Sequence, residues 1–414
     1  MLLQFGTFVA VSRRLPVQQV GSYYELFGLV TTTYFATGLG LPDGLIKTVA
    51  HARAVGEENG TRALILRAGF VSLALTIAVA AISIIVFWSR LSPHLVLFTA
   101  GWWVAYGVLY FCSQVLVALG HTSWGAFFYY PASSIGLFIT SVPYLLFAAN
   151  PNIEGTLCWT MLGAALCAVP ALILVTIYLG GLPSAGQAES LAPVFRLGFS
   201  ICVTRVLQSA LYWIPVWGVG LWLGAAAGAS MATASRLNSA AAAVMAAIRF
   251  TIRPQIVENV ARGNWNLIAS QSRKIATIAT AAVLLVIAAT FLAGHWTIGL
   301  VFGSAYASSS VLVLILLIGT LGECVGGPVD EILKMTGRAD TVSATLVVAS
   351  ALEVALVAAF TRFGSPAAAA GQAAVFVAIY IWFLWLVWKH NGVYVGASPG
   401  WFRTLRWRHS IGSE

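Results

Sequence analysis

The residue best suited to chemistry is Arg205, because it is a permanent charge inside a long apolar run. It lies in a predicted helix, residues 194–222, whose polar face also carries Thr204 and Gln208. A guanidinium presents a planar set of N–H donors that matches phosphate oxygens. A charged side chain within a membrane is costly unless it has a partner or a water-filled path. Arg205 therefore predicts either contact with an anionic substrate or an ion pair that only holds helices together.

Two further groups of residues are candidates for contact with the same substrate. The next predicted helix, residues 226–250, carries Arg236 with Asn238 nearby. Another predicted helix carries Tyr106 and Tyr110 at a spacing of four residues. Aromatic rings suit sugar rings because they combine apolar area with a polar tip. The same pattern is also typical of core packing and of the interfacial belt, so both interpretations stay open.

Three acidic residues fall inside predicted helices, namely Glu25, Glu323 and Glu353. A buried carboxyl whose pKa is raised can exchange protons, so one hypothesis is coupling to H⁺ or Na⁺. The alternative hypothesis is that these acids are structural partners of Arg205 or Arg236. The sequence gives no cofactor and leaves these two roles open.

Residues 322–338 concentrate charges and turn residues in one short stretch. Asp330 and Lys334 lie four residues apart and can neutralise each other on a short helix. A Gly-Gly-Pro break ends or bends the preceding helix. The stretch therefore predicts a cytoplasmic hinge or gate, not an active centre. Its residues are Gly326, Gly327, Pro328, Asp330, Lys334, Gly337 and Arg338.

The composition predicts an all-α integral membrane protein. Hydrophobic residues make up 59% of the 414 positions, charged residues only 8%, and the mean hydropathy is +0.89. The apolar runs are about 20 residues long, enough for a helix to cross the hydrocarbon core. The five cysteines and six histidines show no spacing for a disulfide framework or a metal site.

The apolar runs predict about twelve transmembrane helices in two pseudo-symmetric six-helix bundles around a central cavity. The segment before Pro16 is too short for an ordinary span, so we expect it to be the second half of a first helix. The later spans are expected at about 18–42, 62–89, 93–119, 123–148, 155–180, 194–222, 226–250, 266–293, 305–327, 340–361 and 366–388.

Four regions follow from these spans. We expect an N-terminal bundle at 1–180 with a shortened first helix, a cytoplasmic connector at 181–193, a C-terminal bundle at 194–389, and a basic, aromatic cytoplasmic tail at 390–414. Trp401, Arg403 and Trp407 are typical of a tail that lies on an anionic leaflet.

The basic residues predict the orientation. Most of the 22 Lys and Arg residues lie after even-numbered helices or in the tail, whereas Arg13, Arg14, Arg90 and Arg362 lie on the opposite side. Cytoplasmic loops carry the excess of basic residues. The even-numbered loops are therefore expected in the cytoplasm, and the net charge of +9 reflects topology instead of nucleic-acid binding.

Two sets of motifs resemble a known family over most of the chain. The first set is Leu15-Pro16, Gly21-Ser22-Tyr23, Gly38-Leu39-Gly40-Leu41-Pro42-Asp43-Gly44 and Val49-Ala50-His51-Ala52-Arg53. The second is Phe302-Gly303-Ser304-Ala305-Tyr306, Gly326-Gly327-Pro328 and Lys334-Met335-Thr336-Gly337-Arg338. Their order and spacing resemble the Wzx-type polysaccharide flippases of the multidrug/oligosaccharidyl-lipid/polysaccharide exporter superfamily. The shortened first helix is the main departure.

The resemblance implies a transporter of the bacterial cytoplasmic membrane. Two bundles would alternate access to a central cavity and move a lipid-linked oligosaccharide from the cytoplasmic to the outer leaflet. The expected partners are that substrate, membrane lipids and other polysaccharide assembly proteins, with a monomeric chain and no nucleic acid.

Two alternatives stay open, and the second belongs to another functional class. A multidrug antiporter of the same superfamily would bind organic cations, which a basic cavity should repel. A membrane polysaccharide polymerase would usually need a long outer loop, and the chain has none. No nucleophile elbow, P-loop or dinucleotide fingerprint is present in its proper context, so we expect no enzyme activity.

Overall fold

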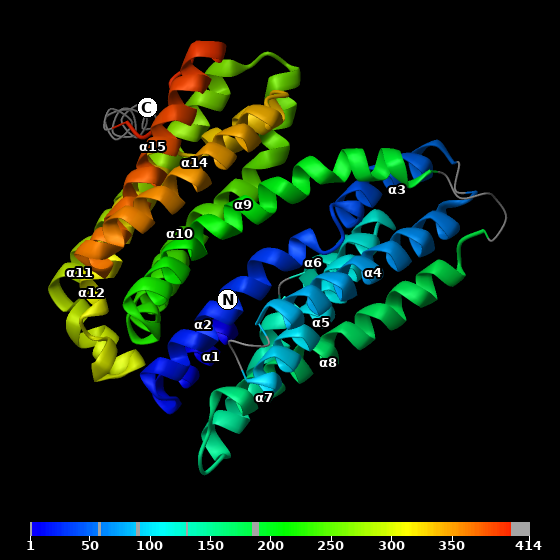
Figure 1. Ribbon diagram of the computed structural model, residues 1–414. Coiled ribbons are helices and arrows are strands. Elements are labelled where there is room, and N and C mark those ends of the chain that lie inside the picture. The colour runs from blue at the N-terminus through cyan, green and yellow to red at the C-terminus, as the bar shows by residue number, and fades with distance from the viewer. Residues whose placement is uncertain (1, 57–58, 88–91, 130, 184–189, 399–414) are drawn as a thin grey trace, which may run out of the picture. The chain divides into compact units, whose positions relative to one another are not determined.

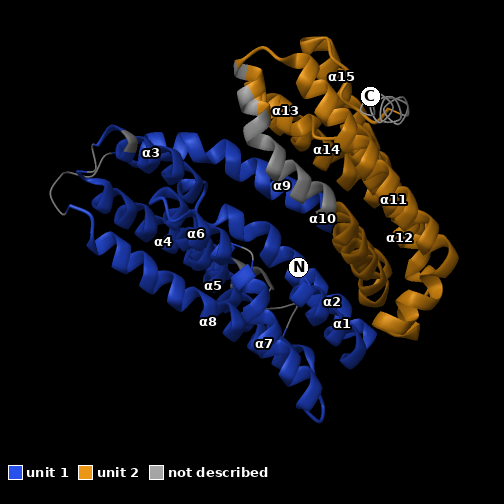
Figure 2. Ribbon diagram, turned by 180° about the vertical axis from the view of Figure 1, so that it is seen from behind, with its two compact units in different colours: residues 1–213 blue, residues 214–414 orange. Residues whose placement is uncertain are grey.

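The computed structural model describes residues 2–56, 59–87, 92–129, 131–183 and 190–398, and no strand occurs among these residues. The chain forms two compact units, 1–213 and 214–414 (Figures 1 and 2). It passes from the first to the second within one helix, α9 (Leu191–Leu223). Unit 1 therefore includes the first part of α9, and the domain boundaries predicted from the sequence stay a prediction.

Unit 1 begins its helices where the sequence supplies start signals. The Ser92 hydroxyl accepts a hydrogen bond from the Leu95 N–H at the start of α5, and the Asn152 side chain accepts one from the Gly155 N–H at the start of α8. The helices are α1 (Leu2–Arg14), α2 (Val17–Thr33), α3 (Leu41–Val55), α4 (Thr61–Phe87), α5 (Pro93–Ala118), α6 (Thr122–Tyr129), α7 (Pro131–Phe147) and α8 (Ile153–Gly180).

Unit 2 contains the rest of α9 and six further helices among its described residues. Close approach is possible where glycines face a neighbouring helix: a Cβ built on Gly319 of α12 would lie 3.1 Å from the Ala373 Cα of α15. The helices are α10 (Ala225–Ala261), α11 (Trp265–Phe302), α12 (Ser309–Gly326), α13 (Val329–Met335), α14 (Ala339–Phe360) and α15 (Ser365–Asn391).

Apolar helices make this a multi-pass membrane protein. Within the described ranges, eight helices are long and apolar enough to cross a membrane, and the bent pair α6 and α7 could form a ninth span. Large apolar side chains on their surfaces are exposed, among them Phe70 at 75% and Leu285 at 72%. Lipid is the natural environment of such faces. The predicted count of twelve stays a prediction.

The predicted helix 18–42 differs from the structure. It breaks after Thr33 into a 3₁₀ turn, Tyr34–Ala36, and a second helix, α3, then runs on to Val55. Leu39 and Gly40 at the break have φ angles of +46° and +85°. Glycine adopts that left-handed conformation without steric cost, so the chain turns there and starts a new helix instead of entering a loop.

Other predicted helices differ in extent, among them the one expected at 266–293, which continues to Phe302 as α11. The run expected at 123–148 is divided into α6 and α7, which flank residue 130, outside the described residues. Helix α10 continues beyond 250 to Ala261. The basic residues that were expected in a loop are therefore helical. Placing the end of this helix at its first basic residues therefore made the predicted helix too short.

The predicted tail, 390–414, is described only as far as residue 398. Val395 is fully buried, and the Ala397 N–H donates to the Val325 carbonyl at 2.8 Å. The start of the tail thus packs on unit 2. The expected membrane-surface residues Trp401, Arg403 and Trp407 lie outside the described residues.

Candidate functional site

Within unit 1, one face of α9 runs antiparallel to α2 and α3. Glycines, hydroxyls and a thiol make many of these contacts. Residue numbers decrease along α9 as they increase along α2 and α3. The facing pairs are Trp213 with Gly28, Ser209 with Thr32, Cys202 with Phe35, Gly198 with Gly40, and Val194 with Gly44. This register places Arg205, three residues after Cys202, beside the break between α2 and α3.

Glycines bring the two backbones into direct contact. A Cβ on Gly198 would overlap the Gly40 carbonyl, and a Cβ on Gly44 would overlap the Val194 carbonyl. Small residues allow helices in membranes to approach this closely. The first turn of α3 is therefore held against α9, and the Asp43 carboxylate in that turn lies within reach of Arg205.

Asp43, Tyr110 and Arg205 form a closed triangle of polar contacts, which we call the Arg205 cluster. The Arg205 Nη1 donates to the Tyr110 hydroxyl at 2.7 Å, and the Tyr110 hydroxyl donates to Asp43 Oδ2 at 2.7 Å. The Arg205 Nη2 forms an ion pair with Asp43 Oδ1 at 3.2 Å. Charge-assisted contacts of this kind fix the guanidinium in one orientation.

The cluster leaves part of the guanidinium accessible. The Arg205 side chain is 28% exposed, whereas the Asp43 side chain is 1% exposed. The Arg205 Cζ also lies 5.6 Å from the Tyr129 ring centroid and 6.0 Å from that of Phe35. Aromatic faces attract a cation. Because a guanidinium has more N–H donors than its contacts with Tyr110 and Asp43 use, this arrangement can receive a further anionic group.

The other predicted residues of unit 1 occupy different surroundings. Tyr106 is buried and makes edge-on ring contacts with Tyr34 and Trp102, both at 5.6 Å between centroids. The Thr204 hydroxyl donates to a carbonyl of its own helix at 2.9 Å, and Gln208 is half-buried. Among the predicted substrate residues of unit 1, the structure thus brings Tyr110 into contact with Arg205, while Tyr106 packs among aromatic rings.

The predicted residues of unit 2 lie on α10. Asn238 is buried, and its side-chain oxygen accepts a hydrogen bond from Thr320 of α12 at 2.8 Å. Arg236 is half-buried on the same helix. Asn238 therefore ties two helices of unit 2 together, and substrate contact by Arg236 and Asn238 stays a prediction.

The acid that pairs with Arg205 is Asp43, not one of the three acids predicted as partners. Glu25 is half-buried in α2, Glu323 is 3% exposed in α12, and Glu353 is fully buried in α14. Neither carboxylate oxygen of Glu353 has a hydrogen-bond partner among the described residues. Their role in coupling stays a prediction.

The stretch predicted as a hinge is a helix break. Gly326 ends α12, and Gly327 and Gly337, with φ angles of +73° and +80°, flank the short helix α13. The Lys334 ammonium lies 3.1 Å from Asp330 Oδ2, which confirms the ion pair expected from the spacing. Arg338 occupies the N-cap position of α14, Pro328 that of α13. Movement at this break stays a prediction.

Sequence reasoning missed Asp43. A carboxylate after Gly-Leu-Pro is ordinary in the first turn of a helix, so Asp43 does not stand out within its motif. The spacing of Gly40 and Gly44 was the available signal, since small residues four apart often mark a close helix contact. That signal does not name α9 as the partner.

Metal and disulfide chemistry have no candidate among the described residues. No group of three or more His, Cys, Asp or Glu side chains there is placed to hold a metal ion. The five cysteines are free thiols.

Known proteins resemble this chain in fold but not in sequence. No protein-family model matches the chain, and no curated protein sequence matches it. Solved structures of similar fold include an inward-facing multidrug resistance MATE family transporter of the MOP superfamily. The two chains share 13% identity with a TM-score of 0.65, over 93% of each chain.

Two further structures resemble the chain over most of its length. The lipid II flippase MurJ, in an inward closed conformation, gives a TM-score of 0.68 at 13% identity over 93% of this chain and 86% of that one. A MOP superfamily transporter from Pyrococcus furiosus gives 0.61 at 12% identity over 94% and 92%. The protein thus has the fold of the MOP superfamily transporters.

Proposed function

We propose that this protein moves a lipid-linked oligosaccharide, the precursor of a polysaccharide, from the cytoplasmic to the outer leaflet. The observation that carries the proposal is the Arg205 guanidinium, which is fixed on two sides and 28% exposed. A lipid pyrophosphate is an anion that a guanidinium recognises. The similarity in fold to MOP transporters, one of which is a lipid II flippase, supports a lipid-linked substrate.

Substrate binding at the Arg205 cluster would alter the contact between α3 and α9. A phosphate oxygen and the Asp43 carboxylate compete for the same guanidinium. When phosphate takes the place of Asp43, the ion pair at 3.2 Å is lost, and the α3 to α9 contact keeps only its backbone packing. Because α9 continues from unit 1 into unit 2, its release couples binding to the alternation of access.

The remaining predicted residues have proposed roles in the same cycle. Arg236 and Asn238 would contribute polar contacts to the substrate from unit 2, and Glu25, Glu323 or Glu353 would couple transport to H⁺ or Na⁺. The break between α12 and α13 would act as the cytoplasmic gate. The surrounding membrane lipids are expected partners of the chain.

A multidrug antiporter is the competing proposal, because one structure of similar fold is a multidrug resistance transporter. Such a transporter would need to accept organic cations. The accessible group of the Arg205 cluster is itself a cation, and the only acid in that cluster is already paired with it. The charge of the cluster therefore favours an anionic substrate.

Depletion of the protein in living cells tests the proposed function. Lipid-linked oligosaccharide should accumulate in the cytoplasmic leaflet, where an outer-leaflet glycosidase cannot reach it. An unchanged distribution between the leaflets would contradict a flippase.

Complementation of the depleted cells tests the site. Arg205→Ala should fail to restore export although it inserts normally, while Arg196→Ala, which changes an exposed arginine of the same helix, should restore it. Full export by Arg205→Ala would remove the site assignment without touching the flippase proposal.

A further inference from the structure

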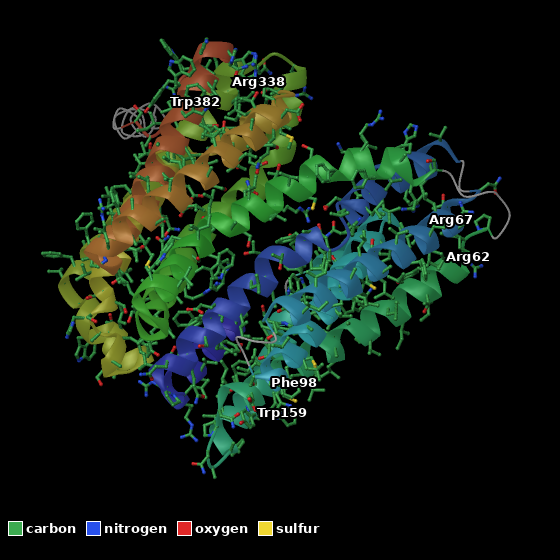
Figure 3. The ribbon with its side chains drawn as sticks, viewed as in Figure 1. Arg62, Arg67, Phe98, Trp159, Arg338 and Trp382 are labelled. Carbon is green, nitrogen blue, oxygen red and sulfur yellow. The ribbon has the colours of Figure 1, made fainter. Side chains whose placement is uncertain are left out.

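The segment after α15 turns back over the break between α12 and α13. Gly392, with a φ angle of +67°, ends α15, and residues 392–398 continue without helix or strand. Val395 in this segment is fully buried. Figure 3 labels Arg338, which follows α13, and Trp382 of α15, both toward the same end of unit 2. The segment therefore belongs to the packed end of unit 2.

Hydrogen bonds fix this segment to two different helices. The Ala397 N–H donates to the Val325 carbonyl of α12 at 2.8 Å. The Ser398 N–H donates to the Thr277 hydroxyl of α11 at 3.1 Å. The Tyr394 hydroxyl donates to the Ala397 carbonyl at 3.1 Å, which closes the segment on itself. Two consecutive residues thus connect the segment to α11 and α12.

The bond to Val325 uses a carbonyl that the break has separated from its helical partner. In a continuous helix, the carbonyl of residue 325 accepts from the N–H of residue 329. Here α12 ends at Gly326 and α13 begins at Val329. Pro328 between them has no N–H, so it interrupts the hydrogen bonds of the helix. The Ala397 N–H serves in place of the Val329 N–H, and it therefore stabilises the broken form.

The same segment packs against the backbone of the break. A Cβ built on Gly327 would lie 3.0 Å from the Ala276 Cβ of α11 and 3.6 Å from the Val395 carbonyl oxygen. A Cβ built on Gly396 would lie 3.0 Å from the Val325 carbonyl oxygen. Gly327 has a φ angle of +73°, and glycine allows its backbone to rotate there. The segment beside it leaves little room for that rotation.

We propose that residues 392–398 form a latch that limits opening of the break between α12 and α13. The latch holds α13 in its present position, and α13 moves away only after the hydrogen bonds of Ala397 and Ser398 are released. This equilibrium exists without any substrate, so it goes beyond the transport function. Only its consequence rests on the proposed function: if the break is the cytoplasmic gate, the latch determines how often that gate opens.

Hydrogen–deuterium exchange of the full chain in detergent, without substrate, tests the latch. Ala397→Pro removes the N–H that bonds to Val325. Amides in residues 329–336 should then exchange about fivefold faster, which corresponds to the loss of one hydrogen bond of about 1 kcal/mol. The control is Val393→Pro, because the Val393 N–H makes no backbone hydrogen bond to another described residue. It should leave exchange in residues 329–336 unchanged.

A milder pair of variants tests the second hydrogen bond. Thr277→Val keeps the shape of the side chain and removes the acceptor of the Ser398 N–H, so it should also speed exchange in residues 329–336. Thr297→Val should not, because the Thr297 hydroxyl bonds only to carbonyls of its own helix. Exchange in α14 should stay unchanged in all four variants, since the latch acts on the break alone.

The coupling is reciprocal, so a change at the break should release the latch. Gly327→Ala places a Cβ toward Ala276 and Val395 and should speed exchange at the amides of Ala397 and Ser398. Gly337→Ala is the matched control, because Gly337 also has a positive φ angle, +80°, but its Cβ would meet nothing within 4 Å. It should leave those two amides unchanged.

Three results would overturn the proposal. The first is unchanged exchange in residues 329–336 in both Ala397→Pro and Thr277→Val. The second is faster exchange that extends through α14, which would show general support of the fold instead of a latch. The third is an equal effect of a variant and its control, either Val393→Pro with Ala397→Pro or Gly337→Ala with Gly327→Ala.

Discussion

Replacement of Asp43 by asparagine tests the Arg205 cluster in two ways. It should lower the free energy of unfolding and raise the affinity for an anion. The substitution keeps the shape of a side chain that is 1% exposed and removes its charge. The carboxylate accepts from Tyr110 at 2.7 Å and pairs with Arg205 at 3.2 Å. Hydrogen bonds to charged groups contribute about 1.5–3 kcal/mol each, and asparagine retains weaker contacts. We expect Asp43→Asn to lower the free energy of unfolding by about 2–3 kcal/mol, measured by SDS titration in mixed micelles.

The same substitution should strengthen the binding of an anion. In the wild type a phosphate must displace Asp43 from Arg205, and in the variant it meets a neutral side chain. A difference of about 1.4 kcal/mol in this competition is about tenfold in affinity. The dissociation constant for farnesyl pyrophosphate, measured by titration calorimetry in detergent, should fall by about that factor in Asp43→Asn. Arg205→Gln should weaken the same binding.

A change of an exposed aspartate is the matched control. Asp340 lies in the first turn of α14, and Asp340→Asn should change the free energy of unfolding by no more than about 0.5 kcal/mol. It should leave the affinity for farnesyl pyrophosphate unchanged. If Asp43→Asn binds the probe no more tightly than wild type, phosphate and Asp43 do not compete for Arg205. If it unfolds like wild type, the ion pair does not stabilise the contact of α3 with α9.

Two further substitutions test contacts elsewhere in the chain. Gly198→Ala places a Cβ against the Gly40 backbone, so the thermal midpoint in detergent should fall, with a stability loss of about 1–3 kcal/mol. The control is Gly180→Ala, where the Cβ meets open space and should have no such effect. Equal midpoints for the two variants would contradict the close packing. Lys334→Met removes one partner of the buried Asp330 carboxylate and should lower the free energy of unfolding, measured by SDS titration, by about 2 kcal/mol. Wild-type stability would show that this pair is not needed.

The sequence was sufficient to find Arg205 but not its partner. A single charge in an apolar helix is conspicuous because charge is costly there. The partner, Asp43, lies some 160 residues away in the chain, and the two meet only because the break at Gly40 turns α3 toward α9. Glycines at the end of a predicted helix are compatible with a loop, a kink or a new helix.

Local contacts were predicted better than contacts between helices. The pair of Asp330 and Lys334 follows from a four-residue spacing, which holds wherever the segment is helical. Tyr106 and Tyr110 have that same spacing, and their surroundings nevertheless differ. The break brings the Tyr34 ring against both tyrosines, and it also brings the Asp43 carboxylate within hydrogen-bond distance of the Tyr110 hydroxyl. Only tertiary structure separates the packing residue from the cluster residue.

The most direct measurement is the movement of a labelled lipid-linked oligosaccharide across the bilayer of proteoliposomes that contain only this protein. Wild type should expose the labelled sugar to an external glycosidase faster than empty liposomes do. Arg205→Gln should slow that movement at least about tenfold, the effect of losing roughly 1.4 kcal/mol of interaction with the phosphate. Arg196→Gln should move the lipid at the wild-type rate. No movement by wild type would contradict a flippase, and equal rates for wild type and Arg205→Gln would contradict the role of the Arg205 cluster.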